Sequence, residues 1–157
     1  MEDHLYLQDA NANLIIHYWG REITAEEKRR ELHWPASRIM KTVYFDKDSK
    51  LYGFVLPLDK LVDLKSASEY LGLSKREAKS LRLSSRLPSM QSKDSAGPFI
   101  SEVDKGLVSI ILFDKLHDET VDFAYPGNSR VSIHLPYSRA YEIVKEQFPD
   151  IVRTAFL

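Results

Sequence analysis

The sequence contains no cysteine, only six glycines, no long apolar run and no strong excess of either charge. Without cysteine, disulfides, thiol catalysis and cysteine-based zinc sites are excluded. Because no run of about 18 apolar residues is present, a membrane span is not expected. A formal net charge of −1 gives by itself no sign of nucleic-acid binding. These absences predict a globular protein whose default location is the cytoplasm.

The chain is long enough to bury a hydrophobic core. Its 157 residues have the size of one ordinary domain, so we expect a single domain over residues 1–157. Hydrophobic residues make up 43% and charged residues 29%, which is typical of globular proteins. The first residues, MEDHLYLQD, are acidic and lack the basic and then apolar layout of a secretory signal.

Local patterns predict an alternation of strands and short helices. Thr24 and Ser74 are each followed three residues later by glutamate, the capping-box spacing that begins a helix. Further helices are expected over residues 58–71, ending at Gly72, and over residues 136–147. Strands are expected at about 13–19, 38–46, 51–56, 81–85, 106–113, 120–124 and 130–135. The fold class is therefore α+β: a mixed, mostly antiparallel, partly closed barrel-like sheet with flanking helices.

Known catalytic motifs are missing. The five histidines show no metal-ligand spacing, and the chain has no phosphate-binding glycine loop and no nucleophile elbow. The sequence therefore predicts no metal and no cofactor. The serines are expected to be structural.

Lys41 is the most unusual residue of the expected strand 38–46. Alternation places it on the same face as Ile39, Val43 and Phe45, so it either extends to an edge or points into a functional cavity. Gly97 and Gly127 permit backbone geometries that let a ligand approach the main chain, although each is also a common turn residue. Backbone N–H groups beside a lysine would suit a carbonyl oxygen or a phosphate.

Basic residues gather between positions 75 and 93, a segment that contains six lysines and arginines but only one glutamate. A basic patch on a neutral protein can attract phosphates, although from charge alone a solvated face is the favoured interpretation. The long segment 86–106 is rich in proline, glycine and serine and is expected to be a binding loop.

The order of these segments resembles the YbaK-type aminoacyl-tRNA editing domain, which also occurs in bacterial prolyl-tRNA synthetases. The resemblance runs from about Leu14 to Val144. It rests on Lys41-Thr42 before an apolar strand, Leu56-Pro-Leu-Asp-Lys60, Val62-Asp-Leu-Lys65, Tyr70-Leu-Gly72 and Leu81–Ser85. Asp114 after an apolar run, and Pro126-Gly127 before the strand Val131–Leu135, complete the pattern.

The resemblance implies a free-standing deacylase that hydrolyses the ester bond of mischarged tRNA, with tRNA-Pro as the first candidate. Lys41 would hold the tRNA 3′ end, without a metal and with help from the terminal adenosine hydroxyl. The other implied substrate-binding residues are Asp94, Ser95, Ala96, Gly97, Pro98, Gly127, Asn128 and Ser132. Lys75, Arg76, Lys79 and Arg82 would contact tRNA phosphates. The partners implied are tRNA and an aminoacyl-tRNA synthetase, with neither DNA nor a membrane.

One departure from the family keeps alternatives open. The family's loop has the form G-x-x-x-P, whereas Asp94 stands four residues before Pro98. A catalytically silent module that binds tRNA or a synthetase through the same pocket is therefore the main alternative. A regulatory domain that binds a partner through its tyrosine- and phenylalanine-rich surface is a third.

Overall fold

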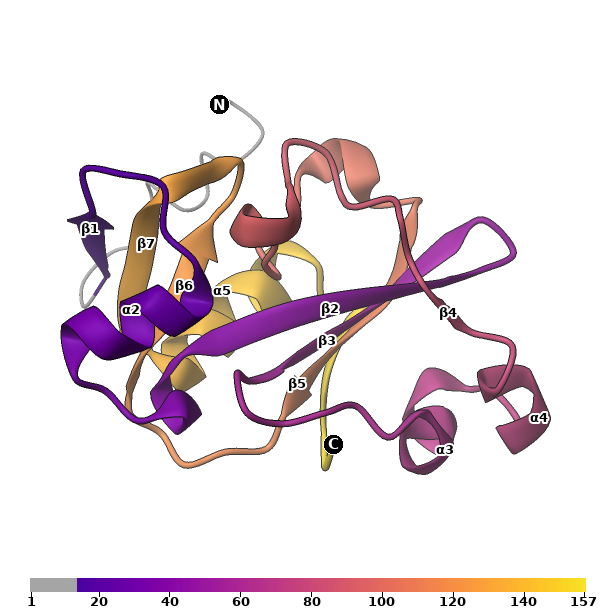
Figure 1. Ribbon diagram of the computed structural model, residues 1–157. Helices are drawn as coiled ribbons and strands as arrows, with labels where there is room; N and C mark the ends of the chain where they lie inside the picture. Colours follow the sequence, from indigo (N-terminus) through magenta and orange to yellow (C-terminus); the bar gives the residue numbers. More distant parts are fainter. Residues whose placement is uncertain (1–13) are drawn as a thin grey trace.

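The computed structural model describes residues 14–157. The acidic N-terminal stretch, for which no secretory signal is expected, lies outside the described residues, as does the start of the first predicted strand. Within the described part, the chain has an α+β fold of two sheets with flanking helices (Figure 1). The predicted fold class is confirmed, and the two sheets do not close into a barrel.

The strands form a three-stranded sheet in the order β1-β7-β6 and a five-stranded sheet in the order β4-β2-β3-β5-β8. All pairs are antiparallel except β3 with β5 and β5 with β8, which are parallel. One isolated bridge between Ile39 and Asp122 joins the sheets. The strands are β1 (Ile15–Tyr18), β2 (Met40–Lys47), β3 (Lys50–Pro57), β4 (Arg82–Leu83), β5 (Val108–Asp114), β6 (Thr120–Tyr125), β7 (Asn128–Pro136) and β8 (Val152–Ala155).

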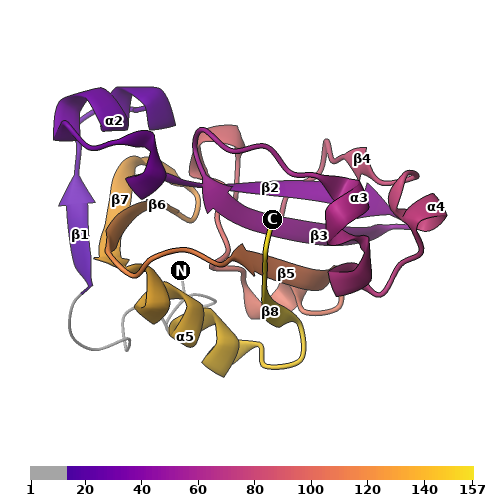
Figure 2. The same ribbon diagram turned by 90° about the horizontal axis from the view of Figure 1, so that it is seen from below.

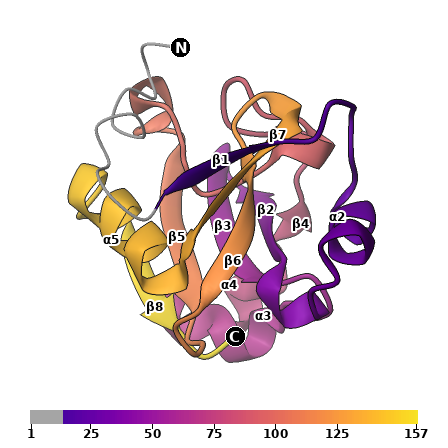
Figure 3. The same cartoon turned by 90° about the vertical axis from the view of Figure 1, so that its left-hand side faces the viewer.

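The helices are short, and two of them begin at the predicted capping boxes. They are α2 (Ala25–Leu32), α3 (Leu64–Ala67), α4 (Lys75–Ala78) and α5 (Tyr137–Gln147), with 3₁₀ turns η2 (Ala36–Arg38), η3 (Ser68–Leu71), η4 (Lys93–Ser95) and η5 (Glu102–Asp104). Thr24 caps α2 and Ser74 caps α4, each with the reciprocal glutamate bond of a capping box. Figure 3 shows α2 and α5 on opposite sides of the sheets.

Several predicted boundaries were wrong. The helix expected from residue 58 begins only at Leu64, where the Asp63 side chain accepts hydrogen bonds from two backbone N–H groups. The strand expected from residue 38 begins at Met40, because η2 precedes it. The strand β8 was not predicted at all, and Figure 2 shows it at the edge beside α5. The strand β8 has only four residues, of which the middle two are exposed, so it lacks the apolar–polar alternation by which a strand is recognised in a sequence.

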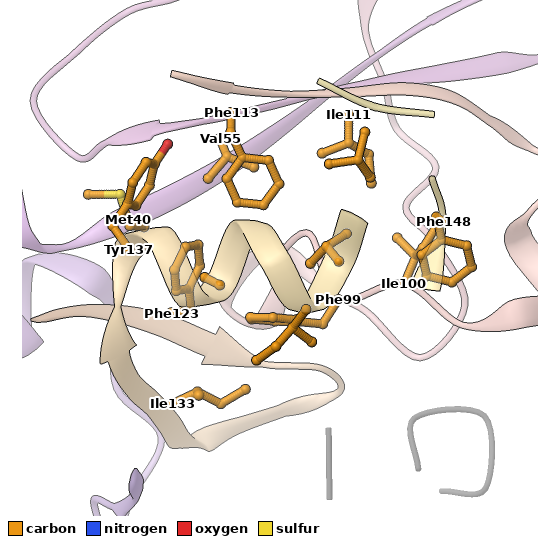
Figure 4. Packing of buried hydrophobic residues seen from close by; sticks show 14 of the residues in the cluster. Met40, Val55, Phe99, Ile100, Ile111, Phe113, Phe123, Ile133, Tyr137 and Phe148 are labelled. Carbon is orange, nitrogen blue, oxygen red and sulfur yellow. The ribbon is translucent and has the colours of Figure 1, made fainter. Parts of the chain in front are cut away.

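The core has two parts, one on each face of the five-stranded sheet. The larger lies between the sheets and α5 and is rich in aromatic rings, such as Phe113 against Tyr137 and Phe99 against Phe123 (Figure 4). The smaller lies under α3 and η3. Because the five-stranded sheet lies between the two core parts, both faces of β2 are covered.

The faces of β2 differ from the sequence-based interpretation. Met40, Thr42 and Tyr44 form the deeply buried face, and Tyr44 is 1% exposed. Lys41 lies on the other face with Val43 and Phe45, which are only partly buried against the smaller core. Lys41 is therefore on the less buried side of a strand whose two faces are both apolar.

A buried ionic cluster joins α2 to the three-stranded sheet. Lys28 donates to Asp122 at 3.1 Å, and Asp122 also bonds His134 Nε2 at 2.8 Å. Asp122 is fully buried, and both partners are nearly so. The His134 ring packs between His17 and Trp34. The cluster fixes α2 close to the start of β2, since Asp122 also bridges to Ile39.

Candidate functional site

The outer edge of β2 is only partly paired. On one side it pairs with β3 along its whole length, whereas on the other it meets β4 only at Phe45 and Asp46. A cavity of about 730 Å³ lies along the remaining edge. After Ser84, which still bonds Tyr44, the chain that follows β4 covers this edge without further pairing (Figure 1). The cavity is lined by Lys41, Thr42, Val43, Tyr44, Leu83, Ser84, Ser85, Leu87, Gln91, Ser92, Lys93 and Ala96.

The ladder geometry directs the backbone of Thr42 toward this open edge. Leu58 N–H donates to Ile39 O at 2.8 Å, so the odd-numbered residues of β2 bond to β3. The even-numbered residues point the other way, as shown by the bond from Ser84 N–H to Tyr44 O at 2.9 Å. Thr42 N–H and C=O therefore face the open edge, and no group in residues 14–157 forms a hydrogen bond with them.

Lys41 supplies positive charge to the cavity. It is half-buried, and among the described residues no hydrogen bond or ion pair involves its ammonium group. Partial burial lowers the pKa of Lys41, while the charge of Asp59 opposes the shift. An ammonium group that has lost water without gaining a partner favours an anionic ligand or an oxygen on which negative charge develops.

The loop opposite β2 is held by two side chains that bind the same glycine. Tyr44 OH donates to Gly97 O at 2.7 Å, and Gly97 N–H donates to Gln91 Oε1 at 3.0 Å. Burial raises the pKa of Tyr44, so its hydroxyl stays a donor. The main chain of Gly97 is therefore fully used within the protein, and the loop has a defined position over the cavity.

The turn between β6 and β7 supports this loop from behind. Gly127 has a φ of +75°, and a Cβ added there would lie 2.4 Å from Met90 O. Only glycine satisfies both the backbone angle and the close approach. The turn thus contacts the segment that carries Gln91, and Asn128 accepts a hydrogen bond from Arg130 N–H within the turn.

The structure brings two of the predicted site residues to the cavity, Lys41 and Ala96. Gly97 and Pro98 are buried in the covering loop without lining the cavity, and Ser95 is buried and bonded to Ser92. Asp94 is exposed.

Of the more distant predictions, Ser132 is fully buried on the three-stranded sheet. It accepts a hydrogen bond from Trp19 Nε1 at 2.9 Å and does not line the cavity, because Ile133 and Leu135 take the core face of β7. Gly127 and Asn128 likewise lie outside the lining.

The predicted phosphate contacts lie on the surface around α4 and β4. Lys75, Arg76, Lys79 and Arg82 are all exposed. Arg82 donates to the backbone of Lys79 at 3.0 Å, which holds these two residues together. Since β4 adjoins the cavity through Leu83, this surface leads toward the cavity.

Thr42, Tyr44 and Gln91 are functional candidates that sequence reasoning missed. Thr42 could have been noticed because it follows Lys41 directly and is polar at a position of the buried face. Gln91 carries no sequence signal, since its role depends on how the loop lies over the strand.

No carboxylate or imidazole belongs to the lining, and the described residues contain no group of three metal-ligating side chains. In the same part of the chain, no helix has the length and apolarity needed to cross a membrane.

No protein-family model matches the chain, and no curated protein matches it in sequence. Solved structures with the same fold do match over nearly the full length. A hypothetical protein gives a TM-score of 0.73 at 15% identity, with 98% of each chain covered. A candidate trans-editing enzyme for prolyl tRNA synthetase gives 0.69 at 16% identity, with 100% of this chain and 97% of that chain covered.

A scaffold protein from computational epitope grafting has the same fold, with a TM-score of 0.66 at 13% identity. It is matched over 100% of this chain and 97% of its own. Identities this low show the fold alone, and one fold supports many functions. The fold is thus shared with a candidate editing enzyme, while the function of this chain has to be argued from its own cavity.

Proposed function

We propose that the protein is an aminoacyl-tRNA deacylase that hydrolyses the ester bond of mischarged tRNA in trans. The observation that carries the proposal is the half-buried Lys41, unpaired among the described residues, on the wall of a cavity of about 730 Å³. This volume is in the range of small-molecule sites and suits the aminoacylated 3′ end of a tRNA. The shared fold with a candidate trans-editing enzyme supports the same proposal.

In the proposed reaction, water attacks the ester carbonyl, and the bond between that carbon and the ribose oxygen breaks. The products are the free amino acid and tRNA with its ribose hydroxyl restored. Lys41 would bind the 3′ end and offset the negative charge that develops on the ester oxygen. Because the lining contains no carboxylate or imidazole, the neighbouring ribose hydroxyl would position the water. No metal is needed for this step.

The exposed basic residues around α4 would attract the acceptor stem. Lys75, Arg76, Lys79 and Arg82 lie on the surface that leads to the cavity, and phosphate contacts of this kind weaken as salt rises. Joint replacement of Lys75 and Lys79 by alanine should weaken tRNA binding and its salt dependence without changing hydrolysis at saturation. Activity on tRNA would place the protein in the cytoplasm.

The test is deacylation of Ala-, Ser-, Cys- and Pro-charged tRNA-Pro by the wild type, Lys41→Ala and Lys47→Ala. Lys47 is the matched control, because it lies on the same strand outside the cavity and pairs with the exposed Asp48. Loss of a placed charge should slow hydrolysis by about 100-fold in Lys41→Ala only, and EDTA should have no effect. Undiminished hydrolysis by Lys41→Ala would remove the lysine from the mechanism.

A catalytically silent tRNA-binding or synthetase-binding module is the second candidate. It is favoured by Gly97, whose N–H and C=O are both bound within the protein and so are not free for substrate. Binding of tRNA with no release of any amino acid from the panel would support this candidate against the deacylase.

A further inference from the structure

Two buried polar atoms without partners belong to the same cavity. Among the buried side-chain nitrogen and oxygen atoms of residues 14–157, Thr42 Oγ1 and Gln91 Nε2 alone form no hydrogen bond. Both residues line the cavity beside β2. Buried polar groups in folded proteins are nearly always paired, so two exceptions in one cavity require an explanation.

The orientation of Gln91 is fixed by its neighbour. Gly97 N–H is a donor, so the side-chain oxygen of Gln91 must face it, and the NH₂ group must point elsewhere. The NH₂ group lies beside the Tyr44 hydroxyl and opposes the rise in the pKa of Tyr44, but its geometry falls short of a hydrogen bond. Gln91 therefore uses its acceptor to hold the loop, and its donors reach a ligand only when the side chain turns away from Tyr44.

Thr42 offers complementary groups from the opposite wall. Its side chain is 8% exposed, and its hydroxyl can donate one hydrogen bond and accept others. Thr42 and Gln91 together present a donor–acceptor group and a pure donor. One ligand group that satisfies both is a hydroxyl, which can accept from Gln91 and exchange a bond with Thr42. A methyl group satisfies neither, and a thiol forms only weak hydrogen bonds.

The apolar part of the lining favours a neutral ligand group at this place. Val43, Leu87 and Ala96 are partly buried and supply walls where a charged side chain would lose some of its water. The exposed Leu83 and Lys93 and three serines complete the lining. The positive charge of Lys41 is already assigned to the ester end of the ligand under the proposed function.

We propose that the cavity selects an aminoacyl group with a small hydroxyl-bearing side chain, and that Thr42 Oγ1 and Gln91 Nε2 bind this hydroxyl. The proposal rests on the deacylase function and names its substrate class, with seryl-tRNA as the simplest member. Both atoms are covered in the free protein, so binding includes a turn of the half-buried Gln91 side chain around its Gly97 anchor.

The probes are two acceptor-stem RNAs that end in amide-linked seryl-adenosine or alanyl-adenosine. The amide replaces the ester, so the ligands are not hydrolysed and differ by one oxygen atom. The wild type should bind the seryl RNA about 10- to 100-fold more tightly, because the alanyl RNA leaves both polar atoms unpaired in a filled cavity. Deacylation of Ser-tRNA and Ala-tRNA should show the same preference.

Three variants separate the hydroxyl from the shape of its side chain. Thr42→Val keeps the shape and should reduce the preference to about threefold or less, without lowering the melting temperature. Thr42→Ser keeps the hydroxyl and should retain the preference. Thr154→Val, at an exposed position of β8, is the matched control and should behave like the wild type.

The outcomes separate this inference from the proposed function. Equal binding of the two RNAs, with deacylation still present, would overturn the role of Thr42 and Gln91 but leave the deacylase intact. A seryl preference that persists in Thr42→Val would also overturn it. Binding of neither RNA, with no deacylation of any charged tRNA, would overturn the deacylase and this inference with it.

Discussion

Lys28→Met is expected to destabilise the protein strongly, because it removes one partner from a buried ion pair. The Asp122 carboxylate is fully buried and receives hydrogen bonds from Lys28 at 3.1 Å and from His134 Nε2 at 2.8 Å. Methionine fills a similar volume but carries no charge. Asp122 would then keep a buried negative charge with only His134 to stabilise it.

The magnitude follows from the burial of Asp122. Removing one member of a buried pair costs about 3–5 kcal/mol, mostly because the remaining charge is left without water. The free energy of unfolding of a natural domain is about 5–15 kcal/mol, so the loss would be a large fraction of it. For a chain of this size, the melting temperature should fall by about 6 to 20 °C.

Thermal and urea denaturation of four proteins would test this prediction: the wild type, Lys28→Met, Lys28→Met with Asp122→Asn, and Lys47→Met. The double variant should recover part of the loss, since no unpaired charge remains. Lys47 pairs with the exposed Asp48, so its replacement should cost less than about 1 kcal/mol. A cost below about 1 kcal/mol for Lys28→Met would refute the view that Asp122 depends on Lys28.

Two further predictions concern the loop and the cavity. Gly127→Ala should destabilise the protein by at least about 1–3 kcal/mol, because its φ is +75° and the new Cβ would meet Met90 O. Gly20→Ala has a similar φ with open space around it, so denaturation curves in which it costs as much as Gly127→Ala would contradict the packing argument. Because the pKa of Lys41 is lowered, its neutral amine should become abundant at lower pH than usual for lysine. Acetylation rates followed by mass spectrometry should rise earlier with pH at Lys41 than in an unstructured lysine peptide. Binding of tRNA should fall over the same pH range, and identical pH profiles for Lys41 and the peptide would contradict the desolvation of Lys41.

Local features that depend on neighbouring residues were predictable from the sequence. The capping boxes at Thr24 and Ser74 and the helical end at Gly72 formed as expected. Each depends on hydrogen bonds or backbone angles within a few positions. The start of α3 follows the local cap at Asp63, whereas the strand β8 depends on pairing with the distant β5, which a local pattern does not contain.

The site was predictable only where it follows the strand. Alternation along β2 identified Lys41 as unusual, but it assigned the wrong face to the main core, since apolar residues occupy both faces. A period of two separates the faces without saying which is buried more deeply. Gln91 was beyond reach, because its position depends on Gly97, Tyr44 and the packing of Gly127 against the loop.

The cavity exists because β4 is too short to complete the sheet. A longer β4 would pair with Thr42 and fill the open edge, as it does beside Phe45 and Asp46. Unpaired strand edges are a liability, and here a loop fixed by side-chain bonds covers the edge without using its hydrogen-bonding groups. One strand therefore presents a cation at Lys41 and unpaired polar groups at Thr42 to the same cavity. This arrangement provides charge for one end of a ligand and hydrogen bonds for the other.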